Sequence, residues 1–333
     1  MRPGPAAGRR QPAAAEASWA APGLPRRITA ADGAADLAAW ARAHHGAVRT
    51  ALHRDGAVLL RGFRTGLDNF PACVEALAGT PEAYGERSSP RTELARHVYT
   101  ATDHPAEQPI ALHNENSYQL TFPAALVFSC LTPATTGGAT PLADTRRVLA
   151  RLDASVVRAF TERGVLYQRN YGEGLGVPWQ EAFGTTDRAR AESYCAARDI
   201  TTEWKPGGGL RTTQVRPAVA VHPVTGERVW FNHAAFFHVS GLRAELRDAL
   251  LAQFDERDLP THSYYGDGRP IEPAVLEQLH HAYAAERVRT PWETGDVLLV
   301  DNLLTAHGRE PFTGDRRVVV AMAAPLNWAE VRA

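Results

Sequence analysis

The chain has 333 residues, of which 44% are hydrophobic, and its 36 basic and 37 acidic side chains give a formal net charge of -1. The apolar content is sufficient for a packed core, and the near-zero charge gives no electrostatic reason to expect nucleic acid or an anionic membrane as a partner. No apolar run approaches the length of a membrane span. At this length one large domain is the preferred organisation.

Residues 1–25 are rich in Ala, Pro, Gly and Arg and have almost no large apolar side chains. Burial cannot offset the entropy of ordering such a segment, so we expect a flexible tail followed by one folded domain over residues 26–333. The Arg9-Arg10 pair is followed by no apolar stretch of export length, so it is not a credible targeting signal.

The three cysteines are widely separated and odd in number, and they lack the spacing of a zinc site: they are Cys73, Cys130 and Cys195. Reduced thiols are therefore expected instead of a disulfide framework. This usage favours a cytoplasmic location.

Helical and strand patterns alternate irregularly through the rest of the chain. Strands are expected at 57–61, 95–100, 124–130, 165–171, 213–221, 228–232, 297–300 and 317–323. Helices are expected at 36–53, 69–78, 146–163, 187–198, 242–254 and 273–287. The regular strand-helix-strand repeat of a parallel sheet is missing, which indicates a mainly β fold with flanking helices, of the α+β class. Residues 172–209, rich in Gly and aromatic side chains, indicate a long insertion of the kind that often forms a lid.

Two distant segments carry candidate metal ligands. In His113-Asn114-Glu115 the first and third side chains point to the same face if the segment is extended, so they can share one metal ion. His307, which follows the apolar run 297–300, would complete a set of two histidines and one carboxylate. Such a set leaves three positions open on a six-coordinate ion and is typical of non-haem Fe(II) oxygenases. An isolated triplet would more often be a core histidine and a rim carboxylate, so the interpretation depends on the residues downstream.

An arginine pair follows the second histidine. A Gly-containing turn leads from His307 to Arg316-Arg317, which opens a returning apolar strand. One arginine of the pair is expected to point inward, where its planar, permanently charged guanidinium suits a carboxylate held inside a barrel. The pair therefore suggests a dicarboxylate co-substrate near the metal, although charged residues also guard strand edges.

Taken together, these motifs resemble the TauD/TfdA group of Fe(II)/2-oxoglutarate dioxygenases, and the resemblance runs from about Gly56 to Ala323. Its most specific segments are His113-Asn114-Glu115-Asn116-Ser117-Tyr118, Pro123, Phe128-Ser129-Cys130 and the stretch 137–144. Glu115 resembles the clavaminate-synthase-like and SyrP-like branch, whose members carry Glu where taurine dioxygenase carries Asp. The resemblance implies a double-stranded β-helix, a jelly-roll barrel with the iron at its mouth.

The resemblance also implies roles for single residues. His113, Glu115 and His307 would be the Fe(II) ligands, with 2-oxoglutarate and O2 as co-substrates. Arg317, helped by the Thr140 hydroxyl, would hold the distal carboxylate of 2-oxoglutarate. Because the turn after His307 varies in length across the family, Arg316 remains an alternative to Arg317.

Three further residues are candidates for the substrate pocket: Asn232, His233 and Arg309. The aromatic run 229–238, which contains the first two, also recurs in the SyrP-like branch. The alternative for His233 is a core histidine, and the alternative for Arg309 is a structural ion-pair partner.

The resemblance implies hydroxylation of an unactivated C–H bond of an amino acid, free or tethered to a peptidyl carrier protein, in natural-product or antibiotic biosynthesis. Desaturation or cyclisation of a biosynthetic intermediate is the alternative within the family, and a metal-binding but catalytically silent barrel is the alternative outside enzymes. Related halogenases leave the carboxylate position to Gly or Ala so that chloride can bind, and Glu115 argues against that chemistry. Nothing in the sequence indicates an oligomeric state.

Overall fold

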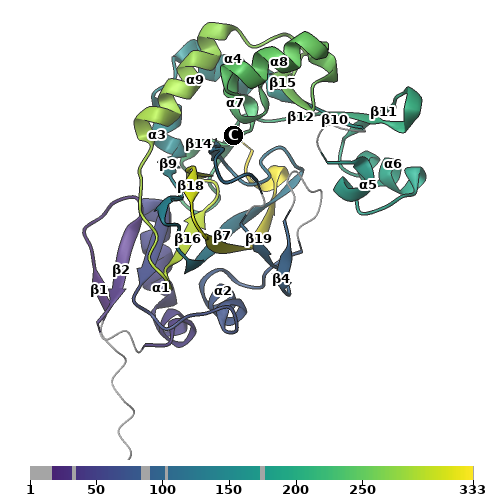
Figure 1. The fold of residues 1–333 in the computed structure, drawn as a ribbon. Helices are drawn as coiled ribbons and strands as arrows, with labels where there is room; N and C mark the ends of the chain where they lie inside the picture. The colour runs from purple at the N-terminus through teal and green to yellow at the C-terminus, as the bar shows by residue number, and fades with distance from the viewer. Residues whose placement is uncertain (1–16, 32–34, 84–90, 102–103, 173–176, 333) are drawn as a thin grey trace, which may run out of the picture.

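A computed structural model describes residues 17–31, 35–83, 91–101, 104–172 and 177–332 (Figure 1). Its centre is an eight-stranded sheet in the order β1-β2-β3-β16-β7-β19-β5-β4. Neighbouring strands run antiparallel except β2 and β3, which are parallel. The strands are β1 (Ala17–Trp19), β2 (Arg26–Ala30), β3 (Ala57–Arg61), β4 (Glu93–Ala95), β5 (Val98–Thr100), β7 (Thr121–Thr132), β16 (Val297–Asp301) and β19 (Arg317–Asn327).

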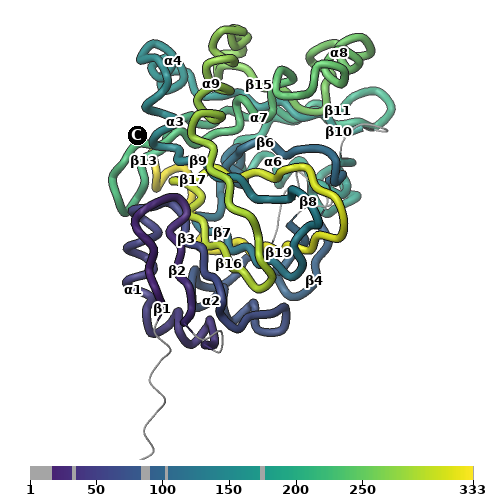
Figure 2. Tube along the Cα trace, turned by 60° about the vertical axis from the view of Figure 1, so that its left-hand side comes forward, coloured from purple at the N-terminus to yellow at the C-terminus, as the bar shows by residue number. Residues whose placement is uncertain are grey.

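Two helices, α1 (Leu37–Asp55) and α2 (Phe70–Ala78), cover the outer face of this sheet (Figures 1 and 2). The Asp36 side chain caps α1 by accepting the N–H of Ala39 at 3.0 Å. The helix ends at Gly56, whose φ of 81° is accessible to glycine at little cost. A Cβ at Gly56 would also lie 2.4 Å from Thr305 Oγ1, so glycine lets α1 pass close to the second sheet.

A three-stranded sheet in the order β6-β17-β9 faces the inner side of the large sheet. Its strands are β6 (Ile110–His113), β17 (Thr305–Arg309) and β9 (Leu142–Asp144), and the short pair β8 (Thr136–Gly137) and β18 (Phe312–Thr313) extends this side. Phe128 and Val320 from the large sheet and Leu142 from β9 share one apolar core between the two layers. Two facing antiparallel sheets around such a core are the arrangement that a jelly roll requires.

The remaining elements lie outside these two sheets, and Figure 2 shows α4, α8 and α9 at the end of the molecule opposite α1 and α2. Another sheet has the order β11-β12-β10-β15, and β13 pairs with β14. These strands are β10 (Val165–Tyr171), β11 (Thr201–Trp204), β12 (Leu210–Arg216), β13 (Val219–Val221), β14 (Arg228–Trp230) and β15 (Thr261–Tyr265). The helices are α3 (Thr145–Ala150), α4 (Ala154–Arg163), α5 (Trp179–Ala182), α6 (Arg188–Ala196), α7 (Ala234–Phe237), α8 (Ala244–Gln253) and α9 (Pro273–Glu286). No helix in the described ranges combines the length and apolarity needed to cross a bilayer.

Three predicted elements are divided in the structure. The strand predicted over 95–100 is the antiparallel pair β4 and β5, joined by a turn at residues 96–97. The helix predicted over 146–163 is two helices, because the backbone N–H of Asp153 donates to the Gln278 side chain at 3.0 Å in place of an intrahelical bond. The strand predicted over 213–221 is likewise divided between β12 and β13.

The flexible tail predicted over residues 1–25 is wrong for residues 17–25. Strand β1 pairs antiparallel with β2, with Ser18 opposite Thr29. The Trp19 ring lies 6.2 Å from the Trp40 ring of α1, so this one large aromatic side chain anchors the segment. Residues 1–16 lie outside the described residues.

The insertion predicted over 172–209 contains α5, α6 and β11, which lie together at the right of Figure 1. Trp179, Ala182 and Ala191 pack with Tyr171 and Leu210 into a small apolar core of their own. The insertion is therefore a packed unit that continues the sheet of β10 and β12.

Candidate metal centre

The three predicted metal ligands lie together at the barrel mouth. Antiparallel pairing of β6 with β17 places His307 opposite His113, with ring centroids 4.5 Å apart. Glu115 follows two residues after β6, and its Oε2 lies 3.7 Å from His307 Nε2. One ligand atom from each residue lies within 4.8 Å of the other two. The geometry thus brings two imidazoles and one carboxylate to a single point.

We expected residues 113–115 to be extended, but β6 ends at His113. Glu115 therefore lies in a turn. The fully buried Asn302 holds this turn: its Oδ1 accepts the backbone N–H of Glu115 at 2.7 Å. Its Nδ2 donates to the carbonyls of Glu115 and Pro123 at 2.9 and 2.7 Å. One amide side chain therefore fixes both backbone groups of Glu115.

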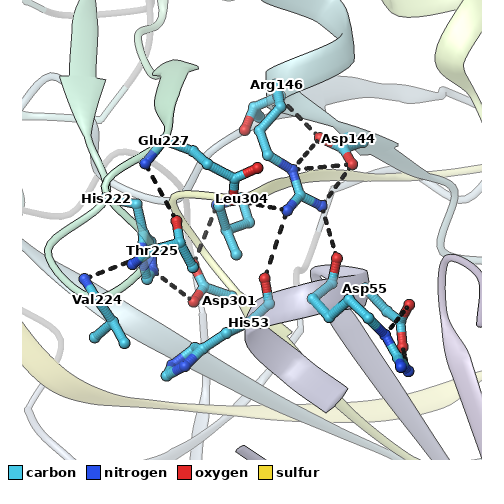
Figure 3. A network of polar contacts seen from close by, with 12 residues as sticks. His53, Asp55, Asp144, Arg146, His222, Val224, Thr225, Glu227, Asp301 and Leu304 are labelled. Carbon is cyan, nitrogen blue, oxygen red and sulfur yellow. Dashed lines mark hydrogen bonds and ion pairs between the residues drawn. The ribbon is translucent and has the colours of Figure 1, made fainter. Parts of the chain in front are cut away.

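The network drawn in Figure 3 includes Asp301, the residue that precedes Asn302 in the chain. Asp301 Oδ1 accepts the N–H groups of Leu303 and Leu304 at 3.0 and 3.1 Å, which shapes the turn between β16 and β17. Its Oδ2 lies 3.0 Å from Nε2 of the buried His222. This anchoring fixes the chain between Asn302 and His307.

His53, His222 and Asp301 also have possible ligand atoms within 4.8 Å of one another. However, His222 Nδ1 accepts the N–H groups of Val224 and Thr225 at 3.2 and 3.0 Å. The ring proton must then be on Nε2, where it is donated to Asp301, so His222 has no lone pair for a metal. We interpret this second cluster as structural support.

The electrostatics at the first cluster suit a cation. Burial raises the pKa of Glu115, but Arg91 and the two histidines outweigh burial and hold that pKa well below its usual range. Arg91 Nη2 lies 3.0 and 2.9 Å from the two carboxylate oxygens. Burial and the neighbouring His307 lower the pKa of His113 to about 3, so its ring is neutral. Its Nδ1 lies 2.9 Å from the Ala111 carbonyl and donates to it, which leaves the Nε2 lone pair for a metal.

We expect Asn302→Asp to weaken both the fold and the metal site. The carboxylate retains an acceptor for the Glu115 N–H but cannot donate to the two buried carbonyls, and each buried group left without a partner costs about 1–3 kcal/mol. Fe(II) affinity should fall roughly 10- to 100-fold because Glu115 loses its orientation. Urea unfolding and anaerobic Fe(II) titration measure the two effects. Wild-type values in both measurements would contradict the proposed role of Asn302.

The predicted inward orientation of Arg317 is wrong: its side chain is exposed, and Arg316 is the inner residue of the pair. Arg316 is half-buried, and its Nε donates to the Gly138 carbonyl at 2.9 Å. Val318 and Val320 lie in the core between the sheets, and Arg316 shares their face because side chains alternate along a strand. The register shift opposite Arg317 skips a residue on β7 and leaves this alternation along β19 intact.

Arg316 is a cation that lacks a carboxylate partner within the described ranges. Burial, reinforced by Arg309, lowers its pKa to about 10, so it remains charged at neutral pH. A Cβ at Gly138 would lie 3.0 Å from Arg316 Cδ, so the glycine makes room for the arginine. Thr140, two residues further on, is buried and accepts a hydrogen bond from Trp292 Nε1 at 3.1 Å, which leaves its hydroxyl hydrogen available. The site can therefore receive an anion.

The three substrate-pocket candidates are buried, and two of them make several hydrogen bonds to the backbone. Asn232 donates to the Ala218 carbonyl at 2.8 Å and accepts the Ala234 N–H at 2.9 Å. Arg309 donates to three backbone carbonyls, those of His104, Pro105 and Gln108. These contacts make Asn232 and Arg309 supports of the backbone, and their role as substrate contacts stays a prediction.

His233 packs against His113 of the metal cluster. Its Nδ1 lies 2.6 Å from Ser117 Oγ, and its backbone N–H donates to the Tyr167 hydroxyl at 2.9 Å. The ring centroids of His233 and His113 are 5.8 Å apart, and burial together with His113 lowers the pKa of His233 well below its usual value. A neutral histidine in this position packs against His113, which is compatible with the core alternative.

The model of the family described as taurine catabolism dioxygenase TauD, TfdA family matches residues 22–322. The chain belongs to this family. The dapdiamide synthesis protein DdaC of Enterobacter agglomerans is 40% identical over 283 residues, which cover 85% of this chain and 86% of that protein. A clavaminate synthase-like protein of Arabidopsis thaliana is 32% identical over 284 residues, covering 81% and 82%.

Among solved structures, the PvcB protein of Pseudomonas aeruginosa has a TM-score of 0.51 at 18% identity and covers 96% of this chain and 94% of its own. Another PvcB structure is described as an Fe, alpha-ketoglutarate dependent oxygenase from an isonitrile synthetic pathway. These likenesses confirm the double-stranded β-helix predicted for this TauD/TfdA chain. The chain is an Fe(II)/2-oxoglutarate-dependent oxygenase.

Proposed function

We propose that His113, Glu115 and His307 hold the Fe(II) of this oxygenase. The observation that carries the proposal is the convergence of their ligand atoms within 4.8 Å. The neutral His113 ring with a free Nε2 and the ionised Glu115 carboxylate have the protonation states that a divalent ion requires. Two nitrogens and one oxygen on one side of the ion leave its other positions for small molecules.

Arg316, with the Thr140 hydroxyl, is proposed to hold the distal carboxylate of 2-oxoglutarate. The Phe128 ring lies 5.3 Å from the His307 ring, so this residue of β7 lies beside the proposed metal site. Cys130, two residues further along β7, pairs with Val318 next to the arginines. Two residues of strand span about 6.6 Å, which suits a five-carbon dicarboxylate chelated at one end and clamped at the other.

When bound, the iron activates O2 at the expense of 2-oxoglutarate so that an unactivated C–H bond can be oxidised. The residues of this chain supply positioning. Arg316 and Thr140 orient the co-substrate, while Asn302 and Arg91 orient the carboxylate ligand. The surrounding apolar side chains Phe128, Val320 and Leu142 keep bulk water from the site. The substrate pocket then selects the bond that is attacked.

The substrate is proposed to be an amino acid, free or bound to a carrier protein, and the reaction to be hydroxylation in a natural-product pathway. The names of DdaC, a dapdiamide synthesis protein, and PvcB, from an isonitrile synthetic pathway, support a biosynthetic role. Desaturation or cyclisation is the alternative outcome of the same chemistry. The three converging candidate ligands disfavour a silent barrel, as does Arg316, which has no carboxylate partner in the described part of the chain. Three free, buried cysteines support a cytoplasmic location.

Product analysis tests this proposal. With Fe(II), 2-oxoglutarate and O2, a panel of free and carrier-bound amino acids should yield succinate and a product heavier by one oxygen atom. In high chloride no chlorinated product is expected, because Glu115 fills the position that halogenases leave open. Mass spectrometry with labelled O2 measures the outcome. A chlorinated product from the unmodified enzyme would exclude the hydroxylase assignment, and a product lighter by two hydrogens would replace it with desaturation or cyclisation.

A further inference from the structure

A cavity of about 190 Å³ lies beside the turn that carries Glu115. This volume is below the roughly 300–1,000 Å³ of sites for drug-sized ligands, so it suits a small molecule. Its walls come from the turn that carries Glu115, the start of β7, the segment after α2 and the end of α6. The residues used below are Glu82, Asn116, Tyr194, Arg198 and Met322.

The cavity lies on the side of the metal cluster away from the proposed 2-oxoglutarate clamp. Three positions along or just before β19 give the order. Arg316 immediately precedes the strand, Val320 pairs with Phe128, which lies beside His307, and Met322 comes two residues after Val320. Met322 lines the cavity, and Asn116 is the residue next to Glu115. A molecule in the cavity therefore lies beside the turn that carries Glu115, on the side away from the proposed clamp.

Opposite charges line this cavity, and neither has an ion-pair partner in the described part of the chain. The Arg198 guanidinium lies 3.8 Å from the centroid of the Tyr194 ring, and no carboxylate of the described ranges pairs with it. Glu82 is partly buried, and no cation among the described residues pairs with it. Desolvation is the sole cause that raises the pKa of Glu82. Each charge can accordingly be satisfied by a ligand group of the opposite sign.

Asn116 supplies a third, independent feature. The residue is only 6% exposed, and its Oδ1 has no hydrogen-bond partner among the residues that the structure describes. The residue adopts a φ of 55°, which is uncommon outside glycine and is tolerated best by Asn and Asp. A buried acceptor without a donor costs about 1–3 kcal/mol, so a ligand that donates to it gains affinity. Because Asn116 lines the cavity, the missing donor is expected from the ligand.

We propose that this cavity binds the ammonium and carboxylate groups of a free α-amino acid substrate. Arg198 holds the carboxylate, and Glu82 and the Asn116 amide oxygen accept from the ammonium group. This inference rests on the proposed function and narrows it, because an aminoacyl thioester on a carrier protein has no free carboxylate for Arg198. Tyr194 and Arg198 belong to the insertion, which thereby supplies one wall of the substrate site.

The test uses the full chain with Fe(II) and 2-oxoglutarate. The probes are L-amino acids, each compared with its amide, its N-acetyl derivative and its carrier-bound thioester. Binding is measured anaerobically from the shift of the visible band of chelated 2-oxoglutarate, and turnover from succinate. We expect at least one free amino acid to bind and react. Removal of its carboxylate or ammonium charge should weaken binding roughly 10- to 100-fold, the range for hydrogen bonds to charged groups.

The variants assign the two contacts. Arg198→Gln should weaken binding of the free amino acid roughly 10- to 100-fold but leave the affinity for its amide unchanged. Glu82→Gln should bind the free amino acid and its N-acetyl derivative with equal affinity. Arg190→Gln, on the exposed side of α6, is the matched control and should behave as the wild type. The band with 2-oxoglutarate alone should be unaltered in all three variants, which verifies an intact metal site.

The outcomes separate this inference from the proposed function. Absence of the 2-oxoglutarate band from the wild type would refute the proposed function itself. A normal band with a thioester preferred over every free amino acid would overturn only the cavity assignment. The cavity assignment would also be wrong if the band were normal but no free amino acid bound. It would be wrong as well if Arg198→Gln lowered the affinities for the amino acid and for its amide equally.

Discussion

We expect His113→Ala and His307→Ala each to abolish the visible band of Fe(II)-chelated 2-oxoglutarate and to eliminate turnover. Each substitution removes one of the two nitrogens that converge with Glu115 within 4.8 Å. The remaining histidine and carboxylate cannot retain the ion at working concentrations, so Fe(II) affinity should fall by more than the roughly 10- to 100-fold that loss of an outer partner costs. Anaerobic titration and succinate formation are the measurements.

His281→Ala is the matched control, because His281 is exposed on α9 and lies outside both histidine-carboxylate clusters. Wild-type band and turnover are expected for this variant. His222→Ala gives a second comparison: it should lower stability through the loss of the buried contact with Asp301 but leave the band at saturating Fe(II). If His222→Ala lost the band while His307→Ala kept it, the metal would belong to the second cluster.

The convergence of His113, Glu115 and His307 could be predicted from the sequence because it depends on residue type and order. Three features can be recognised in the sequence itself: a histidine and a carboxylate close together, a distant histidine after an apolar strand, and arginines at the start of the next strand. The alternation of apolar runs and turns also indicated β3, β7, β10 and β16. These features are local, and local patterns survive in the fold unless tertiary contacts override them.

The supports of the site could not be predicted, because they arise from contacts between distant segments. Arg91 reaches Glu115 from 24 residues upstream, and Asn302 reaches it from 187 residues downstream. Neither belongs to a periodic pattern. The one available signal for Asn302 was its place as an uncharged polar residue after a buried strand and shortly before His307. Similarly, β1 pairs with β2 and its Trp19 ring lies 6.2 Å from the Trp40 ring, contacts that composition alone does not reveal.

The choice between Arg316 and Arg317 also required the structure, for a different reason. Strand β19 lies in the middle of the large sheet and is buried on both faces from Val318 to Met322. Such a strand is apolar at consecutive positions, so no alternation marks the face that lines the barrel. A shift of one residue exchanges the two arginines, and only the pairing of β19 with β7 fixes the register.

Arg316→Ala should therefore raise the apparent KM for 2-oxoglutarate far more than Arg317→Ala. Loss of one partner of a buried guanidinium–carboxylate contact typically costs about 2–5 kcal/mol, which is roughly 30-fold or more in binding. Arg317 is exposed, so its removal should change KM by less than about threefold. Steady-state kinetics with varied 2-oxoglutarate measures both constants.

Arg316→Lys sharpens the interpretation, because it keeps the charge but loses the two parallel donors of the guanidinium. An intermediate KM for Arg316→Lys would identify bidentate binding, whereas a KM equal to that of the wild type would mean that charge alone suffices. Thr140→Val should add a smaller increase, since it removes one neutral hydroxyl donor worth about 0.5–1.5 kcal/mol. A larger effect of Arg317→Ala than of Arg316→Ala would contradict the register of β19 and return the clamp to the outer arginine.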